Sequence, residues 1–173
     1  MTLHELLALF TSKNIEYTTA HLDAVDQNAQ LTDVASDSRE VTPGSLFVCK
    51  GASFSPAYLT CAVETGAVAY LCQQSLAEEL QAVAPNVAAI RVDDVRLAMA
   101  YAAAGVAGHP DKKLTTIGIT GTKGKSTCSY MLRAILDGDE PYSKCGVIGG
   151  IEVFDGKDTQ PAHNTTPEAP ELW

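Results

Sequence analysis

Residues 118–127 read Gly-Ile-Thr-Gly-Thr-Lys-Gly-Lys-Ser-Thr, and this stretch constrains the fold of the chain more than any other. A run of apolar and β-branched residues that includes Leu114 and Ile117 precedes it, and apolar residues at helical spacing, such as Met131 and Ile135, follow it. Strand, glycine-rich turn and helix in this order are the setting in which a backbone loop encloses a phosphate group. The order predicts an α/β unit with an anion-binding loop.

The residue types of this loop suit a nucleoside triphosphate. Glycines allow a tight turn whose N–H groups point at an anion, and the start of the following helix adds partial positive charge. Lys125 would reach the β- and γ-phosphates, and the Ser126 hydroxyl would hold Mg²⁺. The general phosphate-loop pattern has a glycine where this chain has Ile119. A glycine-rich turn that serves only tight packing is the alternative. The predicted nucleotide-binding residues are Gly121, Thr122, Lys123, Gly124, Lys125, Ser126 and Thr127.

Charge and composition exclude several other classes of function. The net charge is −9, with 12 basic and 21 acidic residues, which argues against nucleic acid or an anionic membrane as a partner. No apolar run reaches the roughly 18 residues that span a bilayer, and no secretion signal opens the sequence. The five cysteines include no C-x-x-C pair, so we expect reduced core thiols in the cytoplasm and no cysteine metal site.

Apolar periodicity predicts alternating strands and helices over residues 1–108. Thr2 and Glu5 form a capping-box pattern before a helix, and Asp94 caps a long alanine-rich helix that continues to about Val106. We also expect strands at 46–49, 67–72 and 87–92 and helices at 57–65 and 75–83. Residues 13–33 give no clear pattern. The alternation predicts a Rossmann-like domain with a mainly parallel sheet.

A second α/β unit is expected after a short linker at residues 109–113. It would contain a strand that begins at 114, the phosphate loop, a helix to about Leu136, a strand at 144–149 and a polar loop at 156–164. One strand–helix–strand piece cannot cover both faces of a parallel sheet. We therefore expect residues 114–173 to be the incomplete start of a central domain, and the chain to be the front part of a longer enzyme.

The loop pattern Thr-Gly-Thr-x-Gly-Lys-(Ser/Thr)-Thr resembles the ATP site of the Mur ligases, the amide ligases that build peptidoglycan. Folylpolyglutamate synthetases have a close variant with an extra glycine between the lysine and the serine. Two further segments, Asp-Ser-Arg at 37–39 and Pro-Gly-Ser-Leu-Phe-Val at 43–48, resemble the N-terminal uridine-binding domain of two Mur branches, which those synthetases lack. Asn-Thr-Thr-Pro-Glu at 164–168 is similar to the branch that adds the third residue to UDP-N-acetylmuramoyl-dipeptide.

The resemblance implies a reaction and a set of site residues. ATP would phosphorylate a carboxylate of UDP-N-acetylmuramoyl-L-alanyl-D-glutamate, and an amino acid would attack the acyl phosphate. Lys125 would be the catalytic residue, and Ser126 would hold Mg²⁺. Segment 52–54 falls on a substrate loop but lacks the usual Asp-Gly. Ser36 and Ser38 would hold the uridine diphosphate end of the substrate, and Asn164, Thr165 and Thr166 the muramoyl-dipeptide end.

Other interpretations of the same residues remain open. A fragment of this length could bind a nucleotide or a UDP-sugar without turnover, or could belong to a ligase like the folylpolyglutamate synthetases. Asp-Ser-Arg could be an Asx turn only, and Lys123 could be a solvated side chain. The acidic Mg²⁺ ligand, the modified lysine and the amino-acid pocket of the family have no counterpart in these residues. The third amino acid and the oligomeric state therefore cannot be predicted from this sequence.

Overall fold

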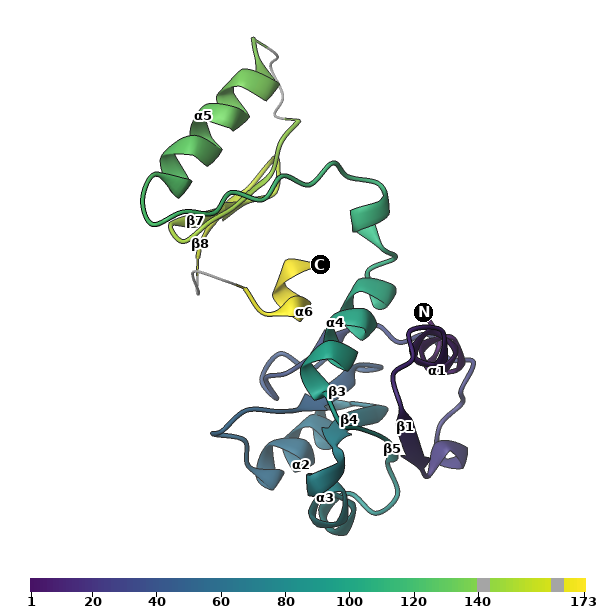
Figure 1. The fold of residues 1–173 in the computed structure, drawn as a ribbon. Helices are drawn as coiled ribbons and strands as arrows, with labels where there is room; N and C mark the ends of the chain where they lie inside the picture. Colours follow the sequence, from purple (N-terminus) through teal and green to yellow (C-terminus); the bar gives the residue numbers. More distant parts are fainter. Residues whose placement is uncertain (140–143, 163–166) are drawn as a thin grey trace. The chain divides into compact units, whose positions relative to one another are not determined.

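The computed structural model describes residues 1–139, 144–162 and 167–173, which form two compact units (Figure 1). The first unit consists of Met1–Lys113 together with Ala169–Trp173, and the second of Leu114–Glu168. The grouping thus places residues 109–113, expected as a linker, and residues 169–173 with the first unit. The predicted site residues Asn164, Thr165 and Thr166 lie outside the described part of the chain.

Five strands form the sheet of the first unit, in the order β1-β5-β4-β3-β2. Strands β2 to β5 are parallel, whereas β1 runs antiparallel to β5. Their bounds are β1 (Tyr17–Ala20), β2 (Val34–Ala35), β3 (Leu46–Cys49), β4 (Ala69–Gln73) and β5 (Ala88–Val92). The predicted α/β class with a mainly parallel sheet is confirmed, as are the three predicted strands. Strands β1 and β2 were not expected from the sequence pattern.

Several helix boundaries of the first unit lie at signals that the sequence carries, whereas the helix at 77–83 begins without a side-chain cap. At the start of the first helix, the Thr2 hydroxyl accepts the N–H of Glu5 at 3.1 Å, and the Glu5 carboxylate accepts the N–H of Thr2 at 2.8 Å. The second long helix ends at Gly66, whose φ of 120° favours glycine. The helices are α1 (Leu3–Ser12), α2 (Pro56–Thr65), α3 (Ala77–Val83), α4 (Val95–Val106) and the short α6 (Ala169–Leu172), with 3-10 turns η1 (Leu22–Ala24), η2 (Gln74–Leu76) and η3 (Pro110–Lys112).

Two hydrophobic cores lie on opposite faces of this sheet, because successive strand residues point to opposite sides. In β3, Leu46 and Val48 belong to the core that includes α1 and α4, while Phe47 and Cys49 belong to the core that includes α2 and α3. Burial raises the pKa of the Cys49 and Cys72 thiols, that of Cys72 to about 11. Both thiols are therefore protonated at neutral pH and serve as packing groups.

The second unit contains α5 (Lys125–Asp137) and a three-stranded antiparallel sheet in the order β6-β7-β8. The strands are β6 (Val147–Ile148), β7 (Glu152–Phe154) and β8 (Thr159–Pro161). The helix after the glycine-rich loop is confirmed. The strand expected at 144–149 is limited to Val147–Ile148, and the loop expected at 156–164 contains β8.

The prediction of a strand that begins at residue 114 is wrong. Residues 114–120 are not in a strand, and Leu114 and Ile117 are 64% and 56% exposed. A strand needs a neighbour for its backbone hydrogen bonds. The three strands described in this unit pair only with one another, so residues 114–120 have no strand partner among the described residues.

Arg133 and Asp137 attach α5 to the small sheet. The Arg133 guanidinium lies 3.6 Å from the centre of the Phe154 ring, and its Nε donates to Asp137 at 3.3 Å. The other carboxylate oxygen of Asp137 accepts the N–H groups of Lys144 and Cys145 at 2.8 and 3.1 Å. This face of the helix is thus held by polar contacts and one stacked ring, while Met131 on α5 is 60% exposed.

None of the helices in the described residues is long and apolar enough to cross a membrane.

Replacing Leu80 tests the core that includes α2 and α3. Leu80 is fully buried, so Leu80→Ala should lower the free energy of unfolding by about 2–5 kcal/mol, through lost transfer energy and a residual cavity. Val83 lies on the same helix and is 38% exposed, so Val83→Ala should change stability by only about 0.5 kcal/mol. Native-state hydrogen exchange of the β4 amides reports on this unit alone. Equal loss of protection in the two variants would show that Leu80 is not packed in this core.

Candidate functional site

The glycine-rich loop 121–127 turns directly into the start of α5. Gly124 immediately precedes the helix with a φ of 79°, a left-handed conformation that favours glycine. A Cβ added at this position would meet nothing within 4 Å, so glycine is needed for the backbone conformation and not for space. No side chain caps this helix at Gly124, and the N–H groups of its first turn have no partner within the helix. These amides are therefore available to an anion.

Lys125 closes the loop. Its ammonium donates to the carbonyl oxygen of Gly121 at 2.8 Å, across four residues of sequence. The contact holds the charge beside the backbone amides of the turn, where a phosphate group would be neutralised. Residues 121–125 are all exposed, so the loop is accessible. In this arrangement Lys125 is the residue of the loop best placed to meet a phosphate.

Ser126 is half-buried in the first turn of α5, and its hydroxyl fits one ligand position of Mg²⁺. Among the described residues, no three His, Cys, Asp or Glu side chains come together in a way that could hold a metal ion. Mg²⁺ in nucleotide sites is commonly bound by few protein groups, with phosphate oxygens and water filling the other positions. The chemistry of the loop therefore fits an ion that arrives with the nucleotide.

A second set of predicted residues lies at the carboxyl ends of β2 and β3. Because these strands are parallel and adjacent, the loops that follow them leave the sheet at the same edge. Ser36 and Ser38 follow β2 and are half-buried, and segment 52–54 follows β3. Within the described residues, neither serine hydroxyl has a hydrogen-bond partner. The structure thus brings Ser36, Ser38 and segment 52–54 to one edge, whereas the glycine-rich loop belongs to the other unit.

Asp37 organises the loop after β2. One carboxylate oxygen accepts the backbone N–H of Arg39 at 2.9 Å, which makes an Asx turn. The Arg39 side chain donates to both carboxylate oxygens, from Nε at 3.0 and 3.1 Å and from Nη2 to Oδ2 at 2.5 Å. These hydrogen bonds from Arg39 lower the pKa of Asp37 to about 2, so the carboxylate is ionised at neutral pH.

Tyr58 is a further residue at this edge that the sequence analysis missed. It lies in the first turn of α2, is 47% exposed, and packs edge-on against Phe54 with ring centres 6.3 Å apart. Asp37 is the largest cause of the raised pKa of the Arg39 guanidinium. Tyr58 also lies close enough to Arg39 to raise that pKa. An exposed aromatic residue near the start of a helix carries no sequence signal that separates a site from ordinary surface.

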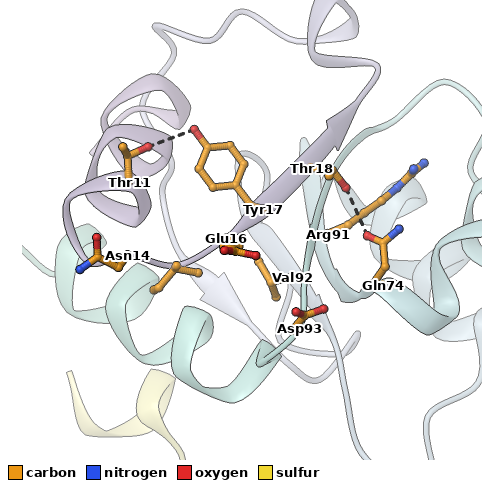
Figure 2. A pocket seen from close by; sticks show the side chains of 10 residues that line it. Thr11, Asn14, Glu16, Tyr17, Thr18, Gln74, Arg91, Val92 and Asp93 are labelled. Carbon is orange, nitrogen blue, oxygen red and sulfur yellow. Dashed lines mark hydrogen bonds between the residues drawn. The ribbon is translucent and has the colours of Figure 1, made fainter.

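A cleft of about 710 Å³ lies elsewhere in the first unit, beside β1 and β5 (Figure 2). Two pairs of its polar side chains form hydrogen bonds with each other, Thr11 with Tyr17 at 3.3 Å and Thr18 with Gln74 at 3.2 Å. None of the predicted site residues lines this cleft. It is lined by Thr11, Asn14, Ile15, Glu16, Tyr17, Thr18, Gln74, Arg91, Val92 and Asp93.

No family model matches the chain, but several known proteins are similar to it and carry related names. A UDP-N-acetylmuramoyl-L-alanyl-D-glutamate–2,6-diaminopimelate ligase from Oceanobacillus iheyensis is 36% identical in an alignment that covers 99% of this chain and 32% of that protein. The ligase of the same name from Caldanaerobacter subterraneus subsp. tengcongensis is 37% identical over 84% of this chain and 29% of its own length. A UDP-N-acetylmuramyl-tripeptide synthetase from Lactobacillus delbrueckii subsp. bulgaricus is 38% identical over 81% of this chain and 27% of its own length.

The chain spans about 30% of the length of the curated relatives that it matches, and the match is to their N-terminal part. All three relatives are named as ligases or synthetases that act on the same UDP-N-acetylmuramoyl peptide or make the tripeptide. The similarity extends over most or all of this chain. The chain therefore belongs to the Mur ligase family, where its relatives are the UDP-N-acetylmuramoyl-tripeptide synthetases.

Proposed function

We propose that this chain is the N-terminal part of an ATP-dependent ligase that adds the third amino acid to UDP-N-acetylmuramoyl-L-alanyl-D-glutamate in peptidoglycan synthesis. The observation that carries the proposal is the loop 121–127, which presents exposed backbone amides and the Lys125 ammonium at the start of a 13-residue helix. The relatives named for this reaction support the same assignment. Such a biosynthetic enzyme would work in the cytoplasm.

The loop would act by positioning and by neutralising charge, which is how proteins catalyse most phosphoryl transfers. The amides of 121–127 would hold the phosphates, and Lys125 would meet the β- and γ-phosphates as charge develops during transfer. Ser126 would provide one ligand to Mg²⁺, an ion that neutralises phosphate charge when bound. Transfer of the γ-phosphoryl group from ATP to a substrate carboxylate would give an acyl phosphate and ADP. The amine of the incoming amino acid would then attack the acyl carbon and release phosphate.

The first unit would hold the UDP end of the substrate at the carboxyl ends of β2 and β3. We assign residues 1–108 to this domain, residues 109–113 to a linker, and residues 114–173 to the first part of the ATP-binding central domain. Ser36 and Ser38 offer hydroxyl groups to the uridine diphosphate, and Asn164, Thr165 and Thr166 would hold the muramoyl-dipeptide. The names of two relatives specify 2,6-diaminopimelate and the third specifies no amino acid, so the proposal leaves that partner open.

A second candidate function is binding without turnover. It is favoured by one observation, that the chain spans about 30% of its relatives' length. A segment of this size can hold a nucleotide or a UDP-sugar while lacking groups that the reaction requires. The two candidates differ in whether ADP forms, not in whether nucleotide binds.

Replacing Lys125 tests the nucleotide site. Lys125→Ala should weaken binding of Mg·ATP to this chain by about 10- to 100-fold, because a charge-assisted hydrogen bond to phosphate is lost. Lys157→Ala is the matched control and should leave the affinity unchanged, since Lys157 is an exposed cation of the same unit that lies outside the loop. Amide chemical shifts of residues 121–127 report the titration. Equal affinity in the Lys125 variant and the parent chain would refute the assignment.

The 173-residue chain on its own should make no tripeptide from ATP, Mg²⁺, UDP-N-acetylmuramoyl-dipeptide and an amino acid. Positioning the attacking amine can contribute on the order of 7–11 kcal/mol, and the relatives named for this reaction are about three times as long. Release of ADP that depends on both the dipeptide substrate and an amino acid is the measurement. Turnover at ordinary enzyme rates would show that all catalytic groups lie within these residues.

A further inference from the structure

The Arg39 guanidinium is presented to solvent in a fixed orientation. A guanidinium has five N–H donors, and Asp37 engages the one on Nε and one on Nη2. The other three, two on Nη1 and one on Nη2, have no hydrogen-bond partner within the described residues. The side chain is 87% exposed, so this outer edge faces outward. A planar edge of parallel N–H groups is the geometry that binds phosphate oxygens in a bidentate manner.

Asp37 supplies the orientation before any ligand arrives. An exposed arginine normally loses rotamer entropy when a ligand fixes its side chain. Here the side chain is already held at both Nε and Nη2, and Asp37 itself is fixed by the Asx turn with the Arg39 N–H. A surface ion pair of this kind adds little to folding stability, because both groups are solvated. The arrangement therefore does more to orient Arg39 than to stabilise the fold.

The groups around Arg39 suit one end of a nucleotide. Ser38 lies between Asp37 and Arg39 in sequence and has no hydrogen-bond partner in the described structure, and the half-exposed Tyr58 is a neighbour on α2. Glu40 also acts electrostatically on Arg39 and would oppose an anion. With a net charge of −9, the protein attracts no anion by its overall field, so a phosphate here depends on a cation held in place.

We propose that Arg39 binds the diphosphate of a uridine diphosphate-sugar, and that Asp37 is the positioning residue that presents it. This inference rests on the proposed function, which places the uridine end of the substrate at Ser38. It adds a charged contact to the hydroxyl groups already assigned there. It also explains why an exposed arginine is bonded to a carboxylate two residues away by both its backbone and its side chain.

Titrating Asp37 tests the positioning part without any ligand. The carboxyl carbon of Asp37, followed by NMR in the whole chain, should titrate with a midpoint near 2. In Arg39→Ala the midpoint should rise toward the ordinary value of 3.8, because the largest cause of the shift is the hydrogen bond from the Arg39 side chain. A midpoint of 3.8 in the parent chain would mean that Asp37 does not hold Arg39 in solution, and would overturn the proposal.

Binding of UDP and of uridine to the whole chain tests the diphosphate contact. Arg39→Ala should weaken UDP by about 10-fold, the loss expected for a charge-assisted hydrogen bond, and leave uridine within about twofold. Asp37→Asn should weaken UDP less, and the double variant should be no weaker than Arg39→Ala alone, since Asp37 acts through Arg39. Lys13→Ala removes an exposed cation that lies over Tyr101, and it should leave both ligands unchanged.

The outcomes separate this inference from the proposed function. Unchanged UDP affinity in Arg39→Ala, or an equal loss for UDP and uridine, overturns the diphosphate contact and leaves the uridine site standing. A parent chain that binds neither UDP nor UDP-N-acetylmuramoyl-dipeptide at millimolar concentration overturns both. If the amide spectrum of Arg39→Ala shows that this variant does not fold, Arg39→Lys takes its place in the binding test. This variant keeps the charge but not the fork, and should weaken UDP while retaining uridine; unchanged UDP affinity in it would count against the proposal.

Discussion

Parallel pairing of β2 to β5 is the constraint from which the arrangement of the first unit follows. Parallel strands need crossover connections, so helices must lie on the faces of the sheet, and two cores result. The same pairing places the carboxyl ends of neighbouring strands at one edge. The loops 36–39 and 52–54 are therefore neighbours in space although β3 separates them in sequence. The pairing of β2 with β3 is enough to bring the two loops together.

The parts that could be predicted are those set by neighbours in sequence. The capping box at Thr2 and Glu5, the run 46–49 and the helix after Gly124 are local signals, and the structure confirms each. Strand β1 is half-exposed and β2 has only two residues. Neither strand therefore shows an alternation of apolar residues long enough to be recognised in the sequence. Residues 114–120 show the reverse error. Their apolar pattern is that of a strand, but a strand forms only where a neighbour supplies hydrogen bonds, and no pattern within the segment reports that.

The same distinction holds for the candidate sites. The loop 121–127 is contiguous, so its residue types alone indicate an anion, and the structure adds only the position of the Lys125 ammonium. Asp-Ser-Arg at 37–39 could be identified as a turn, but the orientation of Arg39 could not. It depends on which rotamer lets one carboxylate accept both a backbone and a side-chain donor. Tyr58 reaches this region through the packing of α2, which the sequence of the loop does not encode.

Both proposed anion sites address the same electrostatic difficulty. A protein with a net charge of −9 repels nucleotides at long range, and the repulsion is screened beyond about 8–10 Å at physiological salt. Within that distance, fixed donors decide binding. Lys125 is held by the Gly121 carbonyl and Arg39 by the Asp37 carboxylate, so each cation is ordered by an acceptor of its own loop. Ordering one cation beside several backbone amides or hydroxyl groups provides a phosphate site without a basic surface. Such a site favours ligands whose phosphates match the fixed donors over polyanions that bind by charge alone.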